Sequence, residues 1–133
     1  MNFQNLNQKI ILQLGFFGVL MGIVTIMGWG QNMEIFMWLF MIIAASLIIK
    51  KNIQKHLFIH CILIGLSWGV DCTIIQALFF NLFTTNNPIY GLQNLSQLIL
   101  PVELLLIGLG IVIGGLSGLI LYSVQLIIIK SKV

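Results

Sequence analysis

The sequence predicts an all-α, polytopic integral membrane protein: a bundle of four transmembrane helices. The prediction starts from composition, because 59% of the 133 residues are hydrophobic and the only charged side chains are six lysines and three acids. A soluble domain typically carries about 25% charged residues, whereas this chain carries 7%. Disorder is excluded as well, because disordered chains are poor in the Ile, Leu and Phe that abound here. The solvent of this chain is therefore expected to be lipid.

The charged residues divide the chain into four apolar stretches. Uncharged runs of 24, 15 and 26 residues follow Lys9, Glu34 and Glu103, and another apolar stretch is interrupted only by Asp71. A helix needs about 20 residues to cross the membrane. The second stretch is short, at ~22 Å, so it needs Met33 or Glu34 in the outer interface and snorkelling by Lys50 at the other end. The expected helices of this single membrane domain, residues 1–133, are 10–29, 33–50, 56–82 and 101–129, with an outer loop at 81–100.

The lysines predict the orientation of the bundle. All of them fall on one side of a four-span arrangement: Lys9, Lys50, Lys51, Lys55, Lys130 and Lys132. By the positive-inside rule that side is the cytoplasm, so both termini are expected to be cytoplasmic and the outer loop to face outward. The predicted location is the cell inner (cytoplasmic) membrane. Within the outer loop, apolar residues at helical spacing over 92–99 predict a short helix lying in the interface.

Small residues are expected to line the helix contacts, because helices in lipid associate through close backbone approach. Three of the expected helices place glycines at helical spacing on one face: Gly15, Gly18, Gly22, Gly65, Gly69, Gly110, Gly114 and Gly118. The helix at 33–50 has only Ala44, Ala45 and Ser46 as small residues and is otherwise bulky. We therefore expect it to be the most peripheral span. The glycine faces favour packing within one bundle, and a homo-oligomer is the alternative.

Asp71 is the one acid inside an expected span, where an aspartate costs about 2.5 to 3.5 kcal/mol. His60, Ser67 and Asp71 share one face of their helix within about 60°. Glu103 begins the last helix in the same outer half of the membrane, so the two carboxylates could converge on a site open to the outside. Such a site would suit a cation, a protonated amine or a proton relay from Asp71 past Ser67 to His60. The structural interpretations are that Asp71 is a protonated, hydrogen-bonded residue and that Glu103 is an interfacial anchor.

The other motifs predict no metal site, no cofactor and no enzyme. His56 and His60 have the spacing of a metal pair and His60 could ligate haem, but the sequence offers no suitably placed further ligand. Cys61 and Cys72 lie ~16 Å apart on one helix, too far for a disulfide. No nucleophile with a base and an orienting group, no phosphate loop and no Cys-x-x-Cys motif is present. The net charge of +3 does not indicate a nucleic-acid partner, because the lysines end apolar segments.

Three functions therefore remain open on the sequence. The first is an accessory or assembling membrane subunit, whose partners are the lipid bilayer and either further copies of the chain or another membrane subunit. The alternative is a small cation- or proton-coupled transporter or channel that uses Asp71 and Glu103. A weaker alternative is a haem- or quinone-binding membrane anchor that uses His60.

Overall fold

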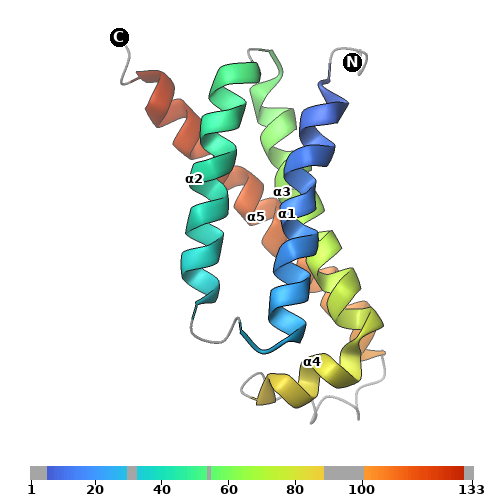
Figure 1. The fold of residues 1–133 in the computed structure, drawn as a ribbon. Helices are drawn as coiled ribbons and strands as arrows, with labels where there is room; N and C mark the ends of the chain where they lie inside the picture. The colour runs from blue at the N-terminus through green and yellow to red at the C-terminus, as the bar shows by residue number, and fades with distance from the viewer. Residues whose placement is uncertain (1–5, 30–32, 54, 89–100, 131–133) are drawn as a thin grey trace.

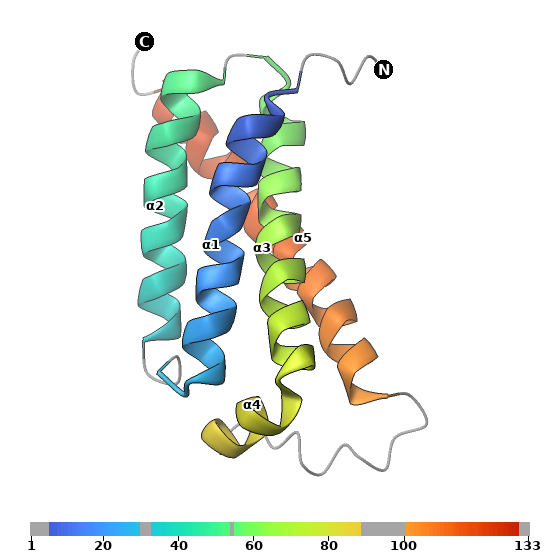
Figure 2. The same ribbon diagram turned by 45° about the vertical axis from the view of Figure 1, so that its right-hand side comes forward.

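The computed structural model describes residues 6–29, 33–53, 55–88 and 101–130, and within these ranges the chain is all-α, as predicted. The helices are α1, Gln8–Ile26; α2, Glu34–Asn52; α3, Leu57–Leu78; α4, Phe80–Asn86; and α5, Val102–Lys130. The long helices form a bundle in which α1 begins, and α2 and α5 end, at the same end (Figure 1). The short α4 lies across the opposite end, beneath α1 (Figure 2). The predicted interfacial helix at 92–99 lies outside the described residues.

Three of the described helices, α1, α3 and α5, are long and apolar enough to cross a membrane. The helix α2 is as long as α1, with 19 residues each. However, α2 begins with Glu34 and has Lys50 and Lys51 in its last turn. Its uncharged interior is therefore the 15 residues that the sequence indicates. The protein is thus a helical bundle in which three helices have the length and composition of membrane spans.

The third helix ends earlier than the sequence predicts. The expected helix over 56–82 and loop over 81–100 are wrong at this boundary, because α3 stops at Leu78 and α4 follows from Phe80. Between them Phe79 has φ −112° and ψ 38°, which lies outside the helical region. The chain turns at this residue, so the seven residues of α4 do not extend the line of α3 (Figure 2).

The position of α4 has a physical reason at the end of α1. The last carbonyl groups of a helix have no partner within it. The side-chain amide of Asn86 donates to the Ile26 carbonyl oxygen at 2.8 Å, and that of Asn87 donates to the Thr25 carbonyl oxygen at 2.7 Å. A third helix continued straight to residue 82 would carry these amides away from α1.

Glycines form the contact between α3 and α5, the most extensive helix pair in the bundle. A Cβ added to Gly69 would lie 2.8 Å from the Cα of Gly114, and one added to Gly118 would lie 2.8 Å from the Cys61 carbonyl oxygen. Real Cβ atoms essentially never approach so closely, so any side chain here would force the helices apart. The two backbones touch directly, as expected of helices that associate in lipid.

The opposite side of α3 packs against α1 in a similar way. A Cβ added to Gly18 would lie 2.6 Å from the Cα of Trp68, and one added to Gly22 would lie 3.2 Å from the Cα of Cys72. The Trp68 side chain is 0% exposed and donates its indole N–H to the Leu14 carbonyl oxygen at 2.6 Å. The helix α3 is therefore enclosed by α1 and α5 along most of its length.

The helix α2 is the most peripheral long helix, as its bulky composition predicts. Its contacts with α1 and α5 are few, and its buried residues are Met41, Ala45, Ser46 and Ile49. Most of its large apolar side chains are exposed, including Phe36, Phe40 and Leu47. One polar contact ties it to α5, where the Gln125 amide donates to the Ser46 carbonyl oxygen at 2.8 Å.

Candidate binding site

His60 lies at the lysine end of the bundle and is 2% exposed. Its Nε2 atom accepts the backbone N–H of Asn7 at 3.0 Å, and its Nδ1 atom lies 2.9 Å from the His56 carbonyl oxygen. Because an acceptor nitrogen carries no proton, these bonds require a neutral ring with its proton on Nδ1. A haem iron would need the lone pair on Nε2 that holds the start of α1. The geometry therefore gives His60 a role in joining α1 to α3.

Asp71 lies within α3, ~21 Å from its start and ~10 Å from its end, and is half-buried beside α1. A Cβ added to Gly15 would lie 2.8 Å from the Ser67 hydroxyl oxygen and 4.0 Å from Asp71 Oδ2, so both side chains face α1. The Ser67 hydroxyl donates to the Ile64 carbonyl oxygen at 2.8 Å. Around α3, Asp71 is about 200° from Gly69, which packs on α5. Its carboxylate thus lies on the side of α3 that packs against α1, away from α5, and we call the surface where these two helices meet the α1–α3 face.

Glu103 is exposed in the first turn of α5. It lines a surface hollow of about 430 Å³ together with residues 77–82, where α3 ends and α4 begins. Asp71 does not line this hollow. The structure therefore does not bring Asp71 and Glu103 together. The predicted relay is not continuous either, since the Ser67 hydroxyl is directed to a backbone carbonyl and His60 lies ~16 Å along α3 from Asp71.

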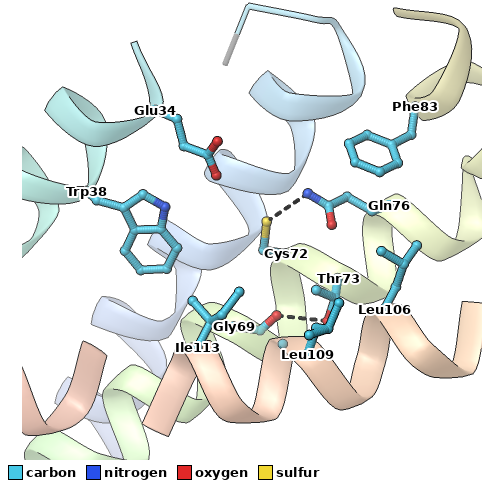
Figure 3. Close-up of a pocket in the computed structure, with 11 residues that line it drawn as sticks. Glu34, Trp38, Gly69, Cys72, Thr73, Gln76, Phe83, Leu106, Leu109 and Ile113 are labelled. Carbon is cyan, nitrogen blue, oxygen red and sulfur yellow. Dashed lines mark hydrogen bonds between the residues drawn. The ribbon is translucent and has the colours of Figure 1, made fainter. Parts of the chain in front are cut away.

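A different acid lines a pocket that is formed by several helices. This pocket, about 250 Å³ in volume, lies between α2, α3, α4 and α5. Figure 3 shows the Glu34 carboxylate directed toward Cys72 and Gln76, with Trp38 beside it. The pocket exists because α5 is tilted: it meets α2 near the lysine end and diverges from it toward the end that carries Glu34 (Figure 1). We call it the Glu34 pocket.

The hydrogen-bond network leaves acceptor atoms on two residues that line the Glu34 pocket, Gln76 and Thr73. The Thr25 hydroxyl donates to the Gly22 carbonyl oxygen at 2.9 Å, so its oxygen must accept the bond from Gln76 Nε2 at 3.0 Å. This bond distinguishes the nitrogen from the oxygen of the Gln76 amide. The side-chain oxygen of Gln76 therefore lies on the side of Thr73 (Figure 3). The Thr73 hydroxyl donates to the Gly69 carbonyl oxygen at 2.9 Å, so it too offers only lone pairs. A ligand that donates hydrogen bonds is matched to these two acceptors and to the Glu34 carboxylate.

An apolar groove adjoins the Glu34 pocket. It has a volume of about 390 Å³ and lies between α2 and α5. The two hollows share Trp38 and Ile113. Apart from Ser117, the side chains that line the groove are hydrophobic: Ile35, Trp38, Leu39, Ile42, Ile113, Leu116 and Ile120. The two hollows therefore adjoin at Trp38 and Ile113, one with a polar lining and the other apolar, and together we call them the α2–α5 cleft.

Sequence reasoning placed Glu34 only as an interfacial residue and did not select Thr73 or Gln76. The available signal was local: both polar residues follow Asp71 within an otherwise apolar stretch. Their meeting with Glu34 depends on helix tilt, which the sequence pattern does not reveal. Among the described residues, no three His, Cys, Asp or Glu side chains are grouped to hold a metal ion.

Comparison of the chain with family models, curated proteins and solved structures found no match. The function must therefore be argued from the residues and their geometry.

Proposed function

We propose that the chain is an inner-membrane protein that crosses the bilayer four times, with both termini in the cytoplasm. The direction of the helices supports the fourth crossing. The consecutive candidate spans α1 and α3 run the same way (Figure 1), and a return of the chain through α2 accounts for this direction. The charges support the orientation, because every described lysine lies at the end where α1 begins: Lys9, Lys50, Lys51, Lys55 and Lys130. Cytoplasmic ends are enriched in lysine.

Cysteine labelling tests this topology. In a background where the buried Cys61 and Cys72 are replaced by alanine, Asn52→Cys reports the lysine end and Thr85→Cys reports α4. Both positions are exposed. A membrane-impermeant maleimide added to intact cells should label only the cysteine at position 85, and permeabilised cells should label both. Labelling of both cysteines from the same compartment would disprove the four-span arrangement.

Within the membrane, we infer that the protein is an accessory subunit that assembles with a partner helix at the α1–α3 face. The observation that carries this role is the half-buried Asp71 carboxylate, which lies between two helices at membrane depth. Ionisable groups inside a membrane usually pair with one another or face water. A lysine or arginine in a partner's transmembrane helix would complete this pairing.

A second copy of the chain does not supply such a cation. All six of its lysines lie outside the uncharged interiors of its spans, so none reaches the depth of Asp71 in a symmetric pair. The proposed partner is therefore a different membrane protein. The transport alternative loses support because Asp71 does not line the hollow that Glu103 lines.

A photo-crosslinking experiment tests the subunit role. A photoreactive residue at Ile74, which is one turn from Asp71 and exposed, should capture a membrane protein with a basic residue in a transmembrane segment. The same probe at Leu39, exposed on α2, is the positional control. Asp71→Asn should abolish the crosslink from position 74 while Glu103→Gln leaves it intact, and the Asp71 variant should still fold. A crosslink that persists in Asp71→Asn, or recovery of the wild-type chain alone, would contradict the proposal.

A further inference from the structure

The α2–α5 cleft has two parts with different chemistry. At one end lie the Glu34 carboxylate and the acceptor oxygens of Thr73 and Gln76, and from there the apolar groove runs between the two helices. We propose that this cleft binds a single-chain amphiphile with a protonated primary amine as its head group. This site is independent of the proposed partner site at Asp71, because Asp71 lines neither part of the cleft.

We infer the chemistry of the ligand's head group from the residues that line the polar end of the cleft. A primary ammonium carries three N–H donors and no acceptor, which complements a carboxylate and two acceptor oxygens. Charge-assisted hydrogen bonds of this kind are about twice as strong as neutral ones. A carboxylate or phosphate head would instead meet acceptors and the negative charge of Glu34. No lysine lines this pocket, so an anionic head would find no counter-charge there.

We infer the alkyl tail of the ligand from the apolar groove that adjoins the Glu34 pocket. Along α2 the lining extends from Glu34 to Ile42, a distance of ~12 Å by the helical rise. This length accommodates an alkyl chain of medium length lying between α2 and α5. Trp38 lines both hollows, so its indole would contact the first part of the chain.

The contact with Trp38 provides the measurement. The protein is placed in phosphatidylcholine nanodiscs with Trp29→Phe, because Trp29 is highly exposed while Trp68 is fully buried. The probes are dodecylamine, dodecanol and dodecanoate, each brominated in the middle of its chain so that it quenches a nearby indole. The amine should quench at about tenfold lower concentration than the other two. Additional Trp38→Phe should remove most of this quenching.

Matched variants separate a specific site from simple partitioning into lipid. Glu34→Gln should reduce the apparent affinity for the amine about tenfold and leave that for dodecanol unchanged. Glu103→Gln, which removes a charge at the same end of the bundle but outside the cleft, should change neither. Ile113→Trp should block the amine by filling the junction of the two hollows, whereas Ile111→Trp, on the exposed side of α5, should not.

Three results would overturn the proposal. The first is equal quenching by the three head groups, and the second is an equal response of Glu34→Gln and Glu103→Gln. The third is full amine binding in Ile113→Trp. None of these outcomes depends on the partner proposed for Asp71, so the amine site and the subunit role can fail separately.

Discussion

The helices α3 and α2 are both apolar, yet they are held in the bundle in different ways. The helix α3 contacts α1 and α5 through glycines, and the neighbouring backbones touch. The helix α2 has no glycine and contacts its neighbours through side chains over a small area. Its apolar residues are mostly exposed, whereas Trp68 of α3 is completely buried.

This difference shows what hydrophobicity does and does not accomplish in lipid. Lipid tails are as apolar as leucine, so an apolar face alone does not drive one helix against another. Close backbone approach stabilises the α1–α3–α5 core, while side-chain contacts leave spaces beside α2. The α2–α5 cleft lies at this loosely packed contact.

The largest effect is expected from a methyl group in the glycine contact of the core. Gly69→Ala would place a Cβ against the Gly110 carbonyl oxygen and 2.8 Å from the Gly114 Cα. Since backbone atoms cannot turn aside as a side chain can, α3 and α5 must separate. Overpacking typically costs about 1 to 3 kcal/mol, and we expect the upper part of this range. The free energy of unfolding, measured by SDS titration in mixed micelles, checks it.

Gly115→Ala is the matched control for Gly69→Ala. A Cβ at Gly115 would meet nothing within 4 Å, so the free energy of unfolding should stay the same or rise by up to about 1 kcal/mol through helix propensity. If the two variants were equally stable, backbone contact would not be what holds α3 in place, and the distinction between α3 and α2 would fail.

Much of the fold was predictable because its signals are local. The length of each apolar stretch and the spacing of glycines such as Gly65 and Gly69 follow from one helix at a time. The turn at Phe79 was not predictable in this way. It is stabilised by hydrogen bonds from Asn86 and Asn87 to carbonyls of α1, about 60 positions earlier in the sequence. A local sequence pattern does not predict a hydrogen-bond partner at this separation.

The candidate sites show the same limit more sharply. Asp71 and Glu103 were paired because both lie in one half of the membrane, which fixes depth but not direction. The direction in which Asp71 points was partly predictable from the sequence. Asp71 lies about 200° around α3 from Gly69, and Gly69 faces α5. The Glu34 pocket could not be predicted from the sequence, since it depends on the tilt of α5 away from the start of α2 (Figure 1).

A smaller effect is expected where α2 is attached. Gln125→Ala removes the amide that donates to the Ser46 carbonyl oxygen at 2.8 Å, and its side chain is 1% exposed. Hydrogen bonds between membrane helices contribute about 0.6 kcal/mol on average and up to about 1.7. Because this bond is buried, we expect a loss of about 1 kcal/mol in the free energy of unfolding, below the loss in Gly69→Ala.

Ser123→Ala is the control for this bond. The Ser123 hydroxyl is exposed and donates only to the Leu119 carbonyl oxygen of its own helix, so its removal should change stability by less than about 0.5 kcal/mol. If Gln125→Ala behaved like Ser123→Ala, the link to Ser46 would add nothing to the attachment of α2. If instead it cost more than Gly69→Ala, α2 would belong to the core, and a cleft beside it would be no easier to open than the glycine contact of α3 and α5.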